Sequence, residues 1–170
     1  MQMSLLIINT MSEDDESAQN CIQQLIKDKQ DYKVIHTENM KINPCIGCNA
    51  CWLKTPGICA IKDDYEEILK AYLQYDIVLF LAETSLGFVR YPMKNVIDRI
   101  LPLATMYICV VDGQMRHVPR YDKKNTFGLI YKGMADQDYL SHWMERVAIN
   151  MHGTSIGAFT MEQIQERQGY

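Results

Sequence analysis

The sequence predicts an α/β protein built on an open, doubly wound sheet of parallel strands. Short apolar runs, which suit strands buried on both faces, alternate with segments whose apolar residues recur at the helical period. Strand and helix therefore take turns along the 170 residues, an order that produces a parallel sheet with right-handed crossovers. Five strands and four helices are expected, with helices on both faces of the sheet.

The first strand and helix lie at the start of the chain. Residues 5–8 form a bare apolar tetrad, which is typical of a strand buried on both faces. From Ser17, the expected N-cap, apolar residues recur at i, i+3, i+4 and i+7 as far as Ile26, so an amphipathic helix should follow. Residues 32–37 predict a short second strand.

The middle of the chain holds a long loop, a second helix and the strongest strand. Residues 41–62 contain prolines, glycines and four cysteines without periodicity, which indicates a structured loop. Asp63 and Glu66 resemble the start of a capping box, and the apolar residues that follow as far as Tyr72 predict a helix. Residues 76–82 form an unbroken apolar run that suits a strand in the middle of the sheet.

A loop, a third helix and an insertion come next. The loop is expected over residues 83–91, and Pro92 suits the first turn of the helix whose apolar stripe follows it. Residues 107–125 are irregular and indicate an insertion. Within it, Asp112-Gly113 predicts a turn between two short extended pieces.

The last part of the chain completes the sheet. Residues 126–131 predict a fourth strand and residues 154–159 a fifth. Between them, an apolar stripe over residues 140–151 predicts the fourth helix, which Gly153 is placed to end. Residues 161–170 look like a polar tail.

Charge and hydropathy exclude several classes of function. The chain has 17 basic and 21 acidic residues, and it lacks a run of Lys or Arg that could follow a phosphate backbone, so no nucleic-acid partner is expected. No apolar stretch approaches the roughly 20 residues that cross a bilayer, and residues 5–8 are too short for a signal-peptide core. A cytoplasmic protein without a membrane partner is expected, in which six cysteines are more often thiols or ligands than disulfides.

A doubly wound sheet binds its ligands beyond the carboxyl ends of its strands. The relevant loops here cover residues 9–17, 83–91 and 132–137. The first of them enters a helix N-terminus, where free N–H groups and the helix dipole favour an anion such as phosphate. Residues 13–16 place four acids in this loop, and they would repel a phosphate unless they point outward. The alternative is that these acids only stabilise the start of the helix.

Four cysteines in the long loop have a compact spacing. Cys45, Cys48, Cys51 and Cys59 follow C-x2-C-x2-C-x7-C, an arrangement that can ligate a [4Fe-4S] cluster. Zinc and reduced structural thiols are the alternatives. The spacing predicts in every case that the four thiols lie near one another.

Four segments carry a resemblance to a known family. The most specific is C-I-G-C-N-A-C-W-L-K-T-P-G-I-C-A-I-K-D-D at residues 45–64, and the others are residues 9–17, 92–99 and 112–121. In these segments the chain resembles the NADPH-dependent FMN reductase and iron–sulfur flavoprotein group of the flavodoxin-like superfamily. The chain departs from the group in the first loop, which lacks its glycine, proline and basic residues, and at residues 83–85, where the group begins Pro-x-Tyr.

The resemblance implies one flavodoxin-like domain over residues 1–170, a three-layer sandwich with a parallel sheet of strand order 2-1-3-4-5. It also implies non-covalently bound FMN and a homodimer or homotetramer. Residues 41–62 become the cysteine loop, and residues 107–125 become a structural or subunit-contacting insertion.

By position, the resemblance implies which residues hold the flavin. Residues at the loop after the first strand face the phosphate: Thr10, Ser12, Ser17 and Ala18. Residues after the third strand lie beside the ring: Glu83, Thr84, Ser85, Leu86, Gly87 and Phe88. Tyr131, at the end of the fourth strand, would touch the remaining edge of the ring.

The function that these expectations favour is electron transfer. NAD(P)H would give hydride to FMN, and the flavin would reduce an unknown small-molecule or protein acceptor. The cofactor carries this chemistry, so no catalytic side chain is expected. One alternative is an electron carrier with a [4Fe-4S] cluster on the four cysteines. Another is a flavodoxin-fold binding protein that has lost FMN, to which the acids at residues 13–16 and Glu83 point.

Overall fold

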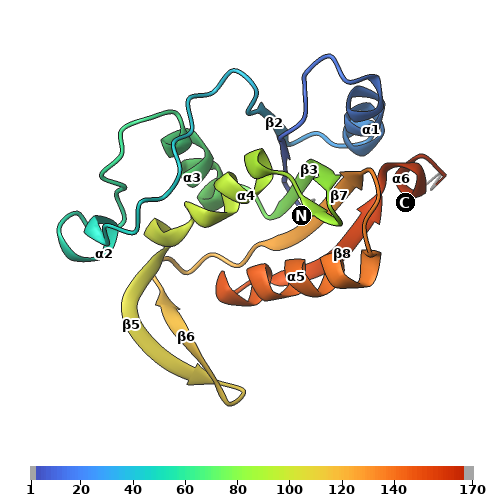
Figure 1. The fold of residues 1–170 in the computed structure, drawn as a ribbon. Helices are drawn as coiled ribbons and strands as arrows, with labels where there is room; N and C mark the ends of the chain where they lie inside the picture. Colours follow the sequence, from blue (N-terminus) through green and yellow to red (C-terminus); the bar gives the residue numbers. More distant parts are fainter. Residues whose placement is uncertain (1–2, 167–170) are drawn as a thin grey trace.

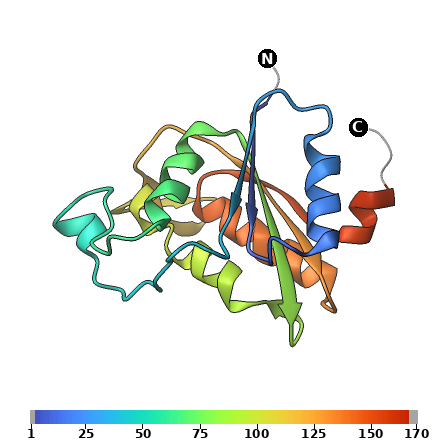
Figure 2. The same cartoon turned by 90° about the horizontal axis from the view of Figure 1, so that it is seen from above.

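A computed structural model describes residues 3–166 as a sheet between two layers of helices (Figures 1 and 2). The strands are β1 (Leu5–Asn9), β2 (Tyr32–His36), β3 (Ile77–Ser85), β4 (Phe88–Val89), β5 (Ala104–Val111), β6 (Gln114–Pro119), β7 (Thr126–Lys132) and β8 (Thr154–Thr160). The helices are α1 (Glu16–Ile26), α2 (Ala50–Leu53), α3 (Tyr65–Gln74), α4 (Tyr91–Asp98), α5 (Gln137–Asn150) and α6 (Met161–Glu166), with a 3-10 turn η1 (Leu101–Leu103).

The strand order of the main sheet is β2-β1-β3-β7-β8, and all four of these pairings are parallel. This is the predicted order 2-1-3-4-5, so the flavodoxin-like fold class is confirmed. β4 adds a short antiparallel pairing to β3, and β5 and β6 form a separate hairpin. No helix in residues 3–166 is long and apolar enough to cross a membrane.

The central strands β1, β3 and β7 bury both of their faces, as their apolar runs predict. Leu6 and Ile8 of β1 belong to the core shared with α3, α4 and α5, while Leu5 and Ile7 pack in the core shared with α1 and α6. Figure 2 shows these two groups of helices on opposite sides of the sheet. Alternate side chains of one strand thus hold two separate helical layers.

Helix α1 begins two residues earlier than expected, because its N-cap is Asp15 and not Ser17. The Asp15 carboxylate accepts a hydrogen bond from the N–H of Ala18 at 3.0 Å, and the Ser17 hydroxyl donates to the same carboxylate. A carboxylate at this position also interacts favourably with the helix dipole, which a hydroxyl does only weakly.

The end of α5 also differs from the prediction. His152, not Gly153, takes the left-handed conformation that ends the helix, with φ 55°. Gly153 is required for another reason, since a Cβ there would collide with the carbonyl oxygen of Asn125. The glycine therefore permits a close approach of two backbones where β8 begins.

Residues 83–91 were expected as a loop, but most of them are regular. β3 continues to Ser85 and turns back into β4, with Ser85 opposite Phe88. Leu86 and Gly87 both have positive φ, 52° and 78°, which is the geometry of a two-residue type I′ hairpin turn. Leu86 gives no local signal for such a turn, because leucine rarely adopts this conformation.

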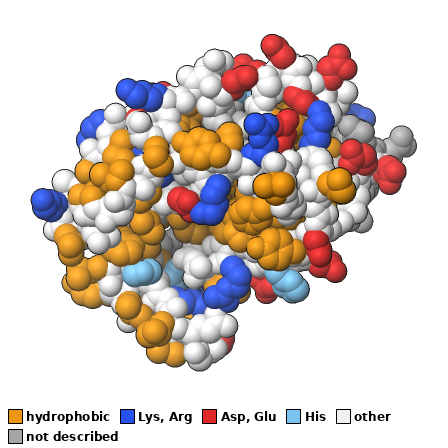
Figure 3. All heavy atoms as spheres, viewed as in Figure 1, with side chains coloured by type: hydrophobic (Ala, Val, Ile, Leu, Met, Phe, Trp, Pro, Cys, Tyr) orange, Lys and Arg blue, Asp and Glu red, His pale blue; other side chains and the backbone are white. Residues whose placement is uncertain are grey.

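The insertion is a hairpin, which we call the hairpin arm (residues 104–119), and it extends away from the sheet in Figure 1. The turn at Asp112-Gly113 is confirmed, but the hairpin starts three residues earlier than the insertion predicted over residues 107–125. Ile108, Val110 and Met115 are 61%, 70% and 78% exposed. Hydrophobic side chains gather in this region, at the lower left of Figure 3.

Two further elements correct the sequence-based expectations. The cysteine loop contains the short helix α2, which has no periodic signal in the sequence because it is only four residues long. Residues 161–166 of the predicted polar tail form α6, whose Met161 is buried against the layer of α1. Residues 167–170 of that tail lie outside the described residues.

Replacing Phe80 with Ala should lower the free energy of unfolding by about 3 to 5 kcal/mol, because a fully buried ring is lost. Phe80 stacks on Phe127 with ring centroids 6.3 Å apart. Urea unfolding followed by circular dichroism measures the change. Met134→Ala, at a side chain that is 90% exposed, is the control and should change stability by less than about 0.5 kcal/mol. A Phe80→Ala loss no larger than that of the control would contradict this packing.

Candidate functional site

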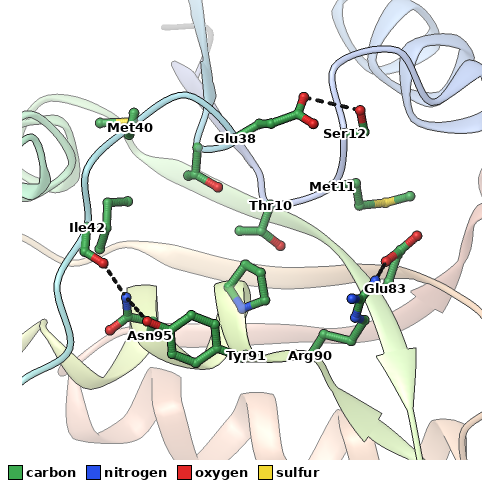
Figure 4. Close-up of a pocket in the computed structure, with 12 residues that line it drawn as sticks. Thr10, Met11, Ser12, Glu38, Met40, Ile42, Glu83, Arg90, Tyr91 and Asn95 are labelled. Carbon is green, nitrogen blue, oxygen red and sulfur yellow. Dashed lines mark hydrogen bonds and ion pairs between the residues drawn. The ribbon is translucent and has the colours of Figure 1, made fainter.

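A cavity of about 480 Å³ opens at the carboxyl ends of β1, β2 and β3 (Figure 4). It lies at the switch point of the sheet, where the connections from β1 and β3 leave toward opposite faces. Its lining residues come from the loops after these strands and from the start of α4: Thr10, Met11, Ser12, Thr37, Glu38, Met40, Ile42, Glu83, Arg90, Tyr91, Pro92 and Asn95.

The floor of the cavity is fixed by hydrogen bonds between neighbouring strand ends. Asn9 is buried; its Oδ1 accepts from the N–H of Met11, and its Nδ2 lies 3.1 Å from Nδ1 of His36. The backbone N–H and the hydroxyl of Thr10 both donate to the carbonyl of Leu81, at 2.9 and 2.8 Å. Thr10 therefore lines the cavity as predicted, but its hydroxyl proton is used to join β1 to β3.

Glu38, from the loop after β2, reaches across the cavity rim to the loop after β1, as Figure 4 shows. Its Oε2 accepts hydrogen bonds from the N–H of Glu13 at 2.7 Å and from the Ser12 hydroxyl at 3.1 Å. These two hydrogen bonds lower the pKa of Glu38, so the carboxylate is ionised at neutral pH. Two donors of the expected phosphate loop are thus engaged by a carboxylate of the chain itself.

A second carboxylate occupies the N-terminus of α1. Asp15 accepts from Ser17 and from the N–H of Ala18, and it forms an ion pair with Lys132 at 2.6 Å. Burial would raise the pKa of Asp15, but the hydrogen bonds from Lys132 and Ser17 outweigh this effect and the pKa falls to about 2. Asp15 therefore turns inward onto the helix, and Ser17 and Ala18 do not line the cavity.

The opposite wall is formed by the end of β3 and the start of α4. Glu83 forms an ion pair with Arg90 at the rim. Behind them, Nδ2 of Asn95 donates to the carbonyl of Ile42 at 2.8 Å and lies 3.4 Å from the Tyr91 hydroxyl. Oδ1 of Asn95 is buried and has no hydrogen-bond partner among the described residues. This wall thus contains a buried acceptor without a partner among the described residues.

The remaining predicted flavin residues lie outside this cavity. Ser85, Leu86 and Gly87 form the β3–β4 turn, and the Thr84 hydroxyl lies 3.2 Å from the carbonyl oxygens of Lys132 and Met134. Phe88 packs against Trp143 of α5 with ring centroids 4.9 Å apart. Tyr131 is buried in the core, and burial raises its pKa.

Several lining residues are not among those predicted from the sequence, notably Glu38, Arg90, Tyr91 and Asn95. The loop that contains Glu38 follows a predicted parallel strand, so its position at the carboxyl edge of the sheet could be predicted from the sequence. Asn95 lies between Met93 and Val96 of the predicted helical stripe and is not part of it, so the pattern gives no signal for Asn95.

The four cysteines come together as predicted, around a smaller cavity beside α2. Cys45 and Cys48 are exposed, Cys59 is half-buried and Cys51 is buried. Burial raises the pKa of Cys51, and the neighbouring thiols raise it further. Within residues 3–166, however, no group of three or more Cys, His, Asp or Glu side chains is close enough to hold a metal ion. A cluster would require the exposed thiols to move.

A buried ion pair supports this cysteine loop. The side chains of Arg99 and Asp63 are 1% and 0% exposed, and they form an ion pair. Arg99 also donates to the carbonyl of Asn43 at 3.0 Å and to Sγ of Cys59 at 3.3 Å, and its guanidinium lies 4.6 Å from the centroid of the Tyr65 ring. One guanidinium thus connects both ends of the cysteine loop to α4.

Solved structures with a similar fold include reductases and a protein with a bound flavin derivative. RosB, in a structure with a bound 8-demethyl-8-formylriboflavin-5′-phosphate intermediate, has a TM-score of 0.66 at 15% identity over 94% of this chain and 64% of that chain. An NAD(P)H:quinone oxidoreductase from Methanothermobacter marburgensis has a TM-score of 0.63 at 10% identity, over 94% of this chain and 86% of that chain. Identities this low establish the flavodoxin-like fold alone.

Curated relatives match a part of the chain. An iron–sulfur flavoprotein of Methanocaldococcus jannaschii is 39% identical over 69 residues, 41% of this chain and 35% of the relative. One from Archaeoglobus fulgidus is 37% identical over 67 residues, 39% of this chain and 32% of the relative. The match thus spans about a third of each relative's length, and no family model matches the chain. The predicted resemblance to iron–sulfur flavoproteins and flavodoxin-like reductases is confirmed.

Asp63→Asn should lower the free energy of unfolding by about 3 to 5 kcal/mol at neutral pH, because it leaves the buried Arg99 charge without its partner. Burial would raise the pKa of Asp63, but the hydrogen bonds from Arg99 and Asn43 hold it below its usual value. The stabilisation is therefore full above the unfolded pKa of about 3.9 and is lost as the pH falls through the folded pKa.

Urea unfolding at several pH values tests this dependence. The exposed Asp122→Asn is the matched control and should change stability by less than about 0.5 kcal/mol. If Asp63→Asn unfolds like this control at neutral pH, the pair does not support the loop.

Proposed function

We propose that this protein is a flavin-dependent oxidoreductase, which takes electrons from NAD(P)H and passes them through the flavin to a small-molecule or protein acceptor. The observation that carries the proposal is the cavity at the switch point between β1 and β3. The neighbours support it, since one binds a riboflavin-phosphate derivative and others are quinone reductases.

The ring end of a flavin suits this cavity. A volume of about 480 Å³ lies in the usual range of ligand pockets, about 300 to 1,000 Å³. Met40, Ile42 and Pro92 supply apolar wall. A bound flavin would supply the hydride and electron chemistry, so the chain needs only to orient the ring and exclude water.

The rim of the cavity, where the phosphate of FMN would bind, is less suitable, although FMN is the flavin that the family resemblance implies. The donors that a phosphate would use are engaged by Glu38 and Asp15. An absorbance spectrum of the purified protein, with and without added flavin, distinguishes flavin bands from a protein that binds none. Loss of the flavin bands when NADH or NADPH is added under anaerobic conditions would show that the flavin accepts electrons from the nicotinamide.

Ile42→Trp should weaken flavin binding at least about tenfold, because the larger side chain fills the cavity. Titration with riboflavin and FMN, followed by flavin fluorescence, measures the affinity. Ile46→Trp, at a side chain that is 72% exposed in the cysteine loop, is the control and should leave the affinity unchanged. If the unsubstituted protein gives no flavin bands after reconstitution, the alternative of a flavodoxin-fold binding protein without a flavin replaces this proposal.

An electron carrier with a [4Fe-4S] cluster is the second candidate, and the four cysteines around one cavity favour it. Arg99 lies beside them and donates a hydrogen bond to Sγ of Cys59. A cytoplasmic location, which keeps thiols reduced, belongs to both proposals. The same spectrum separates them, because anaerobic reconstitution with iron and sulfide would add a broad brown absorbance only if the cysteines bind a cluster.

We also propose that the chain is a homodimer or homotetramer in which a second copy covers the hairpin arm. A two-stranded ribbon is marginally stable in water on its own. Ile108, Val110 and Met115 lie on one face of this ribbon as an apolar ladder, with His117 opposite Ile108 on the same face. In a symmetric dimer, the same face of a second copy would pack against this ladder, and both ladders would be buried.

Val110→Lys should shift the protein toward the monomer, because it places a charge in the centre of this ladder. Sedimentation velocity over a range of protein concentrations measures the change. Met3→Lys, at a side chain that is 56% exposed and lies outside the hairpin arm, is the control and should leave the assembly unchanged. Equal sedimentation of all three proteins would exclude the hairpin arm as the contact.

A further inference from the structure

We propose that the cavity selects a flavin without a terminal phosphate, the riboflavin class, and that the Glu38 carboxylate is the residue that excludes the phosphate. This inference rests on the proposed flavin function and names the form of its ligand. It starts from the donors in the loop after β1 and at the N-terminus of α1, where the phosphate of a nucleotide-like ligand would be bound.

Two carboxylates of the chain already satisfy these donors. Glu38 accepts from the Ser12 hydroxyl and the Glu13 N–H, at 3.1 and 2.7 Å. Asp15 accepts from the Ser17 hydroxyl and from the Ala18 N–H at 3.0 Å. Each carboxylate thus makes the pair of contacts that phosphate oxygens would otherwise make.

The charge of this rim also opposes a phosphate. Residues 9–17 contain four acids and no Lys or Arg. Lys132, the nearby cation, is paired with Asp15, and Arg90 is paired with Glu83. A phosphate ester would bring a further charge of about −1.5 to −2 to this rim, where Lys132 and Arg90 are already paired with carboxylates.

Of the two carboxylates, Glu38 is the one that meets the ligand. It lines the cavity, whereas Asp15 does not. Hydrogen bonds from the Thr37 N–H to Asn9 O, at 2.9 Å, and from the Met40 N–H to Thr37 O, at 3.1 Å, fix the turn that carries it. Glu38 therefore projects from a braced turn and not from a loose loop.

A neutral ligand could form a hydrogen bond with the Glu38 carboxylate, which would repel a phosphate. The carboxylate of Glu38 has a second oxygen, Oε1, in addition to the Oε2 that accepts from Ser12 and Glu13. A polyol tail that ends in a hydroxyl can donate to such an oxygen. The tail of riboflavin ends in a hydroxyl, whereas that of FMN ends in a phosphate. The same residue that excludes the phosphate would thus recognise the dephosphorylated ligand.

The test compares the affinities of riboflavin and FMN, measured by fluorescence titration at low and at high salt. The unsubstituted protein should bind riboflavin at least about tenfold more tightly than FMN at low salt, and the difference should shrink as salt screens the rim. Glu38→Gln should tighten FMN at least about tenfold while riboflavin changes little. Glu145→Gln, on the exposed side of α5, is the matched control and should keep the preference of the unsubstituted protein.

The outcomes separate this inference from the function on which it rests. If FMN binds as tightly as riboflavin, or if Glu38→Gln leaves their ratio unchanged, Glu38 is not a selectivity residue while the flavin function stands. If neither flavin binds to the unsubstituted protein or to Glu38→Gln, and thermal melts show both folded, the proposed function fails and this inference fails with it.

Discussion

The buried guanidinium of Arg99 is the contact on which the region around the cysteines depends. It is held by the Asp63 carboxylate and donates to the backbone of residue 43 and to the thiol of Cys59. A charge that is removed from water is tolerated only when its partners are fixed, so the segments that supply them are held as well. The long loop, which has little regular structure, is thereby tied to α3 and α4 and so to the sheet.

The architecture could be predicted from the sequence because it is encoded locally. Strands buried on both faces produce continuous apolar runs, and crossover helices produce stripes, so the order of elements gives the parallel sheet with few alternatives. Boundaries were less predictable. Both Asp15 and Ser17 are good N-caps in sequence, and Asp15 also pairs with Lys132, which lies 117 residues away in the chain.

The candidate site could be predicted in position but only partly in residues. The loops after β1 and β3 were identified, and Thr10, Ser12 and Glu83 do line the cavity. The contact between Glu38 and Ser12 joins residues 26 apart, and no local pattern announces it. The turn at Leu86 could not be predicted for a different reason, because leucine rarely adopts the positive φ that it has here.

The placement of the two tryptophans has a practical consequence. Trp52, in the cysteine loop, lies against the ring of His117 on β6 at 4.6 Å between centroids, whereas Trp143 packs edge-on against Phe88 at 4.9 Å. The indoles therefore sit in separate neighbourhoods with different quenching groups. If Trp143 is replaced by phenylalanine, the emission of Trp52 reports on the junction of the cysteine loop and the hairpin arm. If Trp52 is replaced instead, the emission of Trp143 reports on the β4 edge.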